Sequence, residues 1–126
     1  MSSSLIWMIV KNNSQSLIKR REGQMCTDKF NLSGRNTFKS NGLIHKNSVA
    51  IYEDGNEIVF SYFKDNEKGQ KSKIIKDSIK DRGRFTLARI QRKSIKAKRP
   101  DLTMTAIRKA SVLMKGIKKR KMINTK

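Results

Sequence analysis

The sequence predicts an α+β fold with a small antiparallel sheet over residues 16–76, a short N-terminal helix and two basic C-terminal helices. Two β-rich runs flank a strong turn signal, and apolar residues recur at helical spacing on both sides of Pro100. The 126 residues are enough for one domain. Within it we expect a compact body over residues 1–80 and a basic helical extension and tail over residues 81–126.

The N-terminal part of the sequence contains one apolar run and a pair of possible strands. Residues 5–10 are apolar and follow three serines that can cap a helix, so we predict a short helix there. Periodicity alone does not separate a helix from a strand in a run of this length. A strand over residues 16–21, a turn at Gly23-Gln24 and a return strand over residues 25–28 are predicted next.

The central part of the sequence predicts a hairpin and a third strand. Residues 48–53 alternate between apolar and polar, and residues 57–64 are rich in β-branched and aromatic residues. The segment Asp54-Gly55-Asn56 between them favours a tight turn in which the glycine has a positive φ. Residues 65–70 then predict a polar turn, and residues 71–75 a third strand.

Five aromatic residues are candidates for the core, namely Trp7 and four in the predicted hairpin. Trp7 lies in an apolar run, which favours a core position. The aromatic residues of the hairpin could stack on bases as those of an RNA-binding sheet do. The four hairpin residues are Tyr52, Phe60, Tyr62 and Phe63, and we expect most of them in the core because the chain has only eight aromatic residues.

The C-terminal part of the sequence predicts two helices. The first helix is predicted over residues 84–98, with Leu87, Ile90 and Ile95 on one side. Four cations are spaced so that they share the opposite face: Arg89, Arg92, Lys93 and Lys96. Pro100 ends this helix and begins a second one over residues 101–116. The apolar residues of this second helix repeat at helical spacing: Met104, Ile107, Ala110, Met114 and Ile117. Gly116 is its predicted stop, and a basic tail is predicted from Lys118.

The charge of the chain is strongly positive and unevenly distributed. The 30 Lys and Arg residues face 10 Asp and Glu residues, a net charge of +20. Residues 1–63 hold 8 basic and 5 acidic residues, whereas residues 82–126 hold 16 basic residues and one acid, Asp101. A solvated helix face is the usual explanation of a short charge run. Because this imbalance persists over a third of the chain, we infer a polyanionic partner, and nucleic acid is the obvious one.

Several other classes of protein are excluded by composition. One cysteine and one histidine permit neither an intramolecular disulfide nor a Cys- or multi-His-based metal site. We expect Cys26 to pack as a small apolar residue and His45 to bond a neighbour or stack on a base. No glycine-rich phosphate loop or catalytic pair is present, so we expect no enzyme, cofactor, metal or small-molecule substrate. The longest apolar run has six residues where a membrane span needs about twenty, which favours a cytosolic or nuclear protein with no membrane partner.

Residues 29–47 are rich in Asn, Ser and Gly and predict an irregular segment. Within it, residues 35–46 combine cations, amides and Gly42, which would let the backbone approach a nucleic acid closely. An ordinary surface loop and an RNA contact explain this stretch equally well.

Three blocks of the sequence resemble one protein family: WMIVKN from Trp7 with SLIKR from Ser16, RNTFKSNGLIHK from Arg35, and RPDLTMTAIRKAS from Arg99. They are similar to the eukaryote-specific large-subunit ribosomal protein family twenty-eight. The tail after Gly116 is shorter than in typical members. The resemblance implies a non-catalytic constituent of the cytosolic large ribosomal subunit that binds and stabilises ribosomal RNA beside neighbouring ribosomal proteins. It also implies passage through the nucleus or nucleolus during assembly.

Charge and resemblance together define the side chains that we expect to contact RNA. A free-standing RNA- or DNA-binding regulator is the alternative, and a small basic enzyme such as a nuclease is a third possibility. The expected RNA-binding residues are Arg35, Asn36, Lys39, Asn41, His45, Lys46, Arg82, Arg84, Arg89, Arg92, Lys93, Lys96, Arg99, Arg108, Lys109, Lys118, Lys119 and Arg120.

Overall fold

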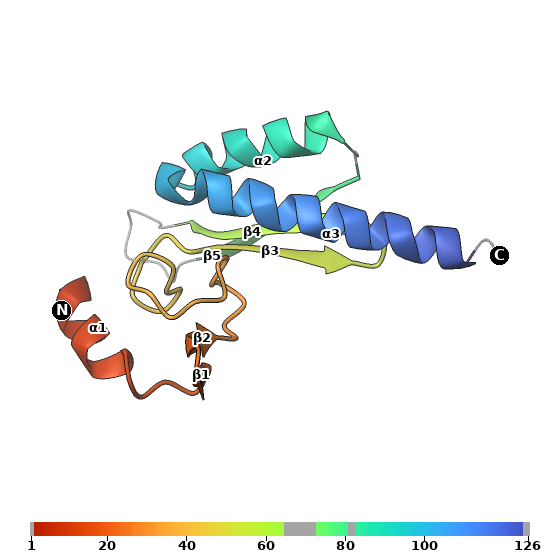
Figure 1. The fold of residues 1–126 in the computed structure, drawn as a ribbon. Coiled ribbons are helices and arrows are strands. Elements are labelled where there is room, and N and C mark those ends of the chain that lie inside the picture. The colour runs from red at the N-terminus through yellow and green to blue at the C-terminus, as the bar shows by residue number, and fades with distance from the viewer. Residues whose placement is uncertain (1, 65–72, 81–82, 125–126) are drawn as a thin grey trace.

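The computed structural model describes residues 2–64, 73–80 and 83–124. The fold is α+β, as predicted, with the helices and strands arranged as in Figure 1. In chain order the elements are α1 (Ser3–Val10), β1 (Leu17–Arg20), β2 (Gly23–Cys26), β3 (Val49–Asp54), β4 (Glu57–Lys64), β5 (Lys73–Ile79), α2 (Arg84–Lys96), the short 3-10 helix η1 (Pro100–Leu102) and α3 (Thr103–Asn124).

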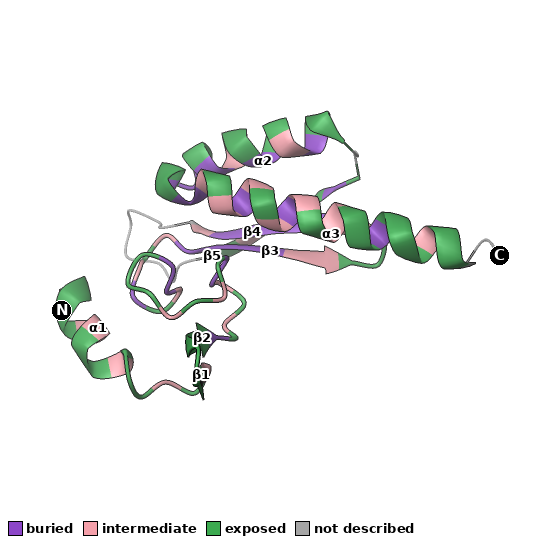
Figure 2. Ribbon diagram, in the orientation of Figure 1, coloured by how far each residue is buried: buried purple, intermediate pink, exposed green. Residues whose placement is uncertain are grey.

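The N-terminal helix α1 is confirmed, but it lies outside the core. The Ser2 hydroxyl caps it by accepting a hydrogen bond from the Leu5 amide. No residue of α1 is buried (Figure 2). The prediction that Trp7 belongs to the core is therefore wrong. Its ring packs edge-on against Phe38, with the two ring centroids 6.0 Å apart, because α1 meets a loop rather than the sheet.

Strands β1 and β2 form a hairpin that differs in detail from the prediction. The register pairs Leu17 with Cys26 and Arg20 with Gly23, so Gly23 and Gln24 belong to β2 rather than to the turn. This register buries the free thiol of Cys26, as expected for a small apolar side chain. The predicted antiparallel sheet is thus divided into this hairpin and a separate three-stranded sheet.

The three-stranded sheet is antiparallel, in the order β3-β4-β5. The turn between β3 and β4 is confirmed, and Gly55 has a φ of 56°. The third strand, predicted over residues 71–75, is described as Lys73–Ile79. The predicted polar turn over residues 65–70 lies outside the described residues.

Helices α2 and α3 cover one face of this sheet, and the main core lies between the two layers (Figure 1). Strand alternation points Ile51, Phe60 and Ile79 toward the helices, because residues two apart share a face. Small residues line the sheet side of α3, where Ala106 and Ala110 are fully buried. Phe60 and Tyr62 are buried in the core, whereas Tyr52 and Phe63 are only partly buried, so two of the four aromatic residues of the hairpin fill the core rather than most of them.

Two apolar residues predicted to face the core are exposed instead. Ile95 has an exposed fraction of 59% and Met104 one of 61%. The buried stripe of α2 runs through Ile90 and Ser94, and each helical residue is rotated by about 100° from its neighbour. Ile95 is therefore turned away from the sheet. Because the buried stripe also contains small residues such as Ser94 and Ala97, the large apolar residues alone do not show which side of α2 faces the core.

Helix α3 is longer than predicted. It passes through Gly116 without a break and ends at Asn124, so the predicted stop and tail are wrong. A glycine inside a helix costs only about 1 kcal/mol relative to alanine. Beyond it, Ile117 is buried in the core and Arg120 pairs with Glu53 on β3. These contacts hold the last turns of the helix against the sheet.

Candidate nucleic-acid interface

Helices α2 and α3 and the residues next to them carry many of the exposed cations. The buried residues of both helices belong to the core, and most other positions are exposed or partly exposed (Figure 2). We call this set the basic helical surface. Within the described part of the chain it consists of nine exposed side chains: Arg84, Arg89, Arg92, Lys96, Lys98, Arg108, Lys115, Lys118 and Lys119.

Two of the predicted RNA-binding cations on these helices are paired with acids on the sheet. Lys93 lies 2.9 Å from the Asp77 carboxylate of β5. Arg120 forms a two-point ion pair with Glu53 of β3. The hydrogen bonds between them, together with the attraction of their opposite charges, lower the pKa of Glu53 and raise that of Arg120. Acids at the edges of the sheet therefore hold both helices in place.

Arg99 is also a predicted RNA-binding residue, and the structure places it inside the protein. Its exposed fraction is 8%. The guanidinium donates to the Asp101 carboxylate and to the backbone carbonyls of Lys39 and Asn47. Arg99 thus connects the helical layer to the long loop after β2, and the hydrogen bonds described for its guanidinium are all made within the protein.

The first half of that loop is organised by Asn31, a buried residue that the sequence analysis did not single out. Its Oδ1 accepts hydrogen bonds from the backbone amides of Ser33 and Gly34 at 3.1 and 3.0 Å. Its Nδ2 donates to the Arg35 carbonyl at 2.9 Å. This tight Asx turn fixes the backbone of Arg35, whose side chain is exposed.

The polar residues of the second half of the loop mostly bond to the protein itself. The amide of Asn36 donates to the Lys11 carbonyl and to the Gln24 side chain. Asn41 is buried and accepts from the Leu43 amide. His45 Nε2 donates to the Phe38 carbonyl at 2.8 Å, which confirms the expected bond to a neighbour.

Gly42 is required for packing within the protein. A Cβ atom at this position would lie 2.5 Å from Phe30 Cβ and 2.6 Å from Asp28 Oδ2. The close approach expected at Gly42 is therefore to the chain itself, where two loop segments meet. Lys39 and Lys46 are exposed on this loop and remain available to a partner.

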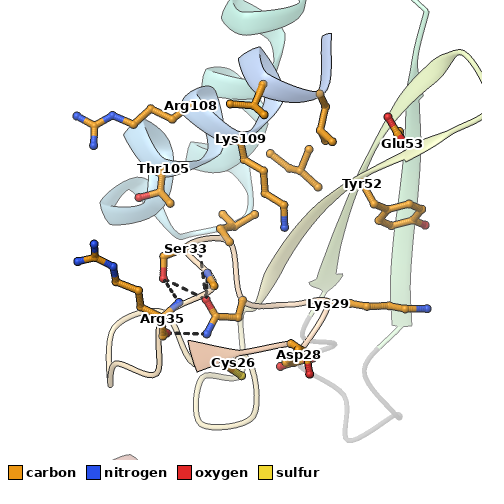
Figure 3. A pocket seen from close by; sticks show the side chains of 17 residues that line it. Cys26, Asp28, Lys29, Ser33, Arg35, Tyr52, Glu53, Thr105, Arg108 and Lys109 are labelled. Carbon is orange, nitrogen blue, oxygen red and sulfur yellow. Dashed lines mark hydrogen bonds between the residues drawn. The ribbon is translucent and has the colours of Figure 1, made fainter. Parts of the chain in front are cut away.

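A groove lies between α3, strand β3 and the segment 26–35 (Figure 3). Its cavity has a volume of about 900 Å³. Lys109 projects into this space, while Arg108 and Arg35 extend toward one side of it in the view of Figure 3. The structure therefore brings together predicted residues from two distant sequence blocks.

The predicted RNA-binding residues differ from the structure in two ways: one of them is not described, and some exposed cations were not predicted. Arg82 lies outside the described residues. Lys98 was not predicted, although a basic residue next to a helix end is a detectable signal. Lys29, which lines the groove, was missed because it stands alone in a polar segment. Phe85, at the start of α2, has an exposed fraction of 79%. A single aromatic residue in the sequence does not indicate whether its side chain is exposed.

The described residues contain no group of three or more side chains suited to hold a metal ion. Among the helices in that part of the chain, none is long and apolar enough to cross a membrane.

Comparison with known proteins identifies the family. The sequence model of the Ribosomal L28e protein family matches residues 5–116. The chain belongs to the Ribosomal L28e protein family. The match covers α1 through most of α3, so the resemblance found in three sequence blocks extends over nearly the whole fold. Membership of this family of ribosomal proteins agrees with the expectation that the chain is not an enzyme.

Two curated relatives illustrate the breadth of the L28e family. The chain is 31% identical over 110 residues to the Trypanosoma cruzi protein named large ribosomal subunit protein eL28, covering 86% of this chain and 73% of that protein. It is 34% identical over 80 residues to the Caenorhabditis elegans protein of the same name, covering 62% of each.

Proposed function

We propose that this chain is a structural constituent of the cytosolic large ribosomal subunit that binds and stabilises folded ribosomal RNA. The observation that carries the proposal is the basic helical surface: nine exposed cations, among the residues described, on α2, on α3 and at the end of α2. Family membership and the large-subunit names of both relatives support the ribosomal setting.

The proposed mechanism is electrostatic. Lysine and arginine side chains replace counterions around RNA phosphates, and the released ions favour binding entropically. The sheet contributes by fixing the helices through the buried contacts of Ile90 and Ala110 and the ion pairs of Asp77 and Glu53. These acids neutralise Lys93 and Arg120, and the exposed cations of the basic helical surface are the proposed RNA contacts.

Exposed cations of the long loop extend the proposed RNA contact. Arg35, Lys39 and Lys46 are exposed on a loop fixed by internal hydrogen bonds. A fixed loop loses little conformational entropy when it binds. Neighbouring ribosomal proteins are the other proposed partners, and assembly of the subunit would take the chain through the nucleus or nucleolus.

Incorporation into ribosomes tests this proposal. In the test variant, Arg92, Lys96, Arg108 and Lys119 are changed to Gln, which removes four outward charges and keeps similar helix propensity. The control changes Lys11, Lys19, Arg20 and Arg21 to Gln, an equal loss of exposed charge near α1 and β1. On a sucrose gradient at moderate salt, the parent and the control should sediment with the large subunit, and the test variant should remain near the top.

Two results of that gradient would contradict the proposal. Equal incorporation of both variants would show that RNA does not lie on the basic helical surface. A parent chain that never sediments with the large subunit would favour the free-standing regulator instead.

A further inference from the structure

The groove between α3, β3 and the segment 26–35 has the size of a ligand site. Its volume of about 900 Å³ lies within the range of about 300–1,000 Å³ that is usual for small-ligand pockets. Leu32, Ile51 and Leu113 are among the apolar residues that line it. A nucleotide-sized group could therefore enter without a rearrangement of the sheet or the helices.

Lys109 brings a partly buried positive charge into this groove (Figure 3). Burial lowers the pKa of its amine, because the walls replace the water that would solvate the cation. Two acids line the same groove, but Glu53 pairs with Arg120, and Asp28 accepts a hydrogen bond from the Phe30 amide. Within the described residues, no ion pair satisfies Lys109.

The other cations of the groove come from two separate elements. Arg108 precedes Lys109 on α3, whereas Lys29 and Arg35 lie in the segment 26–35, and the buried Asn31 side chain fixes the backbone of Arg35. Lys29 extends away from the two arginines in Figure 3. Figure 3 shows the two arginine side chains extending toward the same side of the groove. Cations held on separate, well-ordered elements present a defined geometry to an anion, unlike a row of lysines on one exposed helix face.

We propose that this groove binds a backbone phosphate of an unpaired ribosomal RNA segment, with Lys109 inside the groove and Arg35 and Arg108 at its mouth. The proposal rests on the function proposed above and adds a defined site to the diffuse contacts of the basic helical surface. The apolar walls would contact the ribose or base next to the phosphate. Because the groove is partly desolvated, its contact with phosphate is screened less by salt than the exposed contacts are.

The test compares the same substitution at two lysines of α3 in the full chain. Lys109→Met removes the groove cation and keeps an aliphatic stem, and Lys115→Met removes an exposed cation. The affinity for large-subunit ribosomal RNA transcribed in vitro is measured at about 0.1 M and about 0.3 M KCl. Lys109→Met should weaken binding about tenfold or more at both concentrations, as expected for one lost charge-assisted hydrogen bond. Lys115→Met should weaken it by less than about threefold, and less at the higher concentration.

Thermal unfolding separates a binding role from a structural one. Lys109→Met removes a partly desolvated charge, so the melting temperature should stay the same or rise. A lower melting temperature, or equal losses of affinity in both lysine variants, would overturn the site. Binding of a poly-glutamate peptide with the same sensitivity to Lys109→Met would overturn the assignment of RNA as the ligand. A parent chain that does not bind RNA at all would refute the proposed function itself.

Discussion

Arg99 and Asp101 form a two-point ion pair at the connection between α2 and α3. Nε and Nη2 of the arginine donate to Oδ1 and Oδ2 of the aspartate at 3.0 and 3.1 Å. The same guanidinium donates to the carbonyls of Lys39 and Asn47. Asp101 is the only acidic residue after position 81, and the fold uses it to neutralise a buried arginine. The pair therefore joins the helical layer to the loop that presents Lys39 and Lys46.

Replacing Asp101 should destabilise the protein in a pH-dependent way. The Arg99 guanidinium lowers the pKa of Asp101 below its usual value of 3.8, so the ionised form favours the folded state. Asp101→Asn should cost about 1–2 kcal/mol near neutral pH, because Arg99 loses its charged partner. The contribution is fully present above the unfolded pKa and is lost as pH falls through the lower, folded pKa. Urea unfolding of both proteins from pH 7 to about pH 2 measures this difference. A difference that stays constant over that range would contradict the role of the pair.

Lys98 should be replaceable by glycine with a gain in stability. Lys98 lies two residues beyond the end of α2 with a φ of 56°, while the Arg99 amide donates to the Ser94 carbonyl and the Lys98 amide to that of Ile95. This is a Schellman motif, in which glycine is the preferred residue at the left-handed position. Because that conformation costs a side-chain-bearing residue about 1–2 kcal/mol, Lys98→Gly should be more stable than Lys98→Ala by about 0.5–1 kcal/mol. Both variants lose one charge, so the difference in their unfolding free energies isolates the backbone effect.

Gly42 should not tolerate even a methyl group. The added Cβ would overlap Phe30 Cβ and Asp28 Oδ2 at about 2.5 Å. Gly42→Ala should lower the free energy of unfolding by about 1–3 kcal/mol, the usual effect of overpacking. Chemical denaturation measures this loss, and an unchanged midpoint would show that the two loop segments can separate freely.

Gly116 should respond in the opposite direction. It lies inside α3, and apart from the adjacent residues and the neighbouring backbone of its own helix, no atom lies within 4 Å of a Cβ added there. Gly116→Ala should raise the free energy of unfolding by about 0.5–1 kcal/mol through helix propensity. If Gly116 ended the helix, as the sequence suggested, the same substitution would give no such gain.

Local sequence signals predicted the elements well where chemistry at neighbouring positions decides the structure. Gly55 determines a turn by its backbone freedom, and Pro100 begins η1, where a helix has no intrahelical partner for the amide hydrogen that proline lacks. Helix α2 ends earlier, at Lys96, before the left-handed backbone of Lys98. The length of α3 was not predictable in this way. Its last turns depend on Ile117 in the core and on the pair between Arg120 and Glu53, which are 67 positions apart in the sequence.

The candidate interface was predictable in composition but not in arrangement. Charge counting identified the basic residues, yet it does not show that Arg99, Lys93 and Arg120 bond to the protein itself. Such pairing depends on which acid the fold brings near. The groove around Lys109 was also beyond prediction, because its walls come from three segments separated by long stretches of sequence.

The salt dependence of RNA binding tests the central claim most directly. Nine exposed cations on the described part of α2, its end and α3 suggest that about 8–10 phosphates are neutralised. The logarithm of the association constant for duplex ribosomal RNA should then fall with the logarithm of salt concentration at a slope of about −7 to −9, using the coefficient for duplex DNA. A slope shallower than about −2 would contradict binding through the basic helical surface.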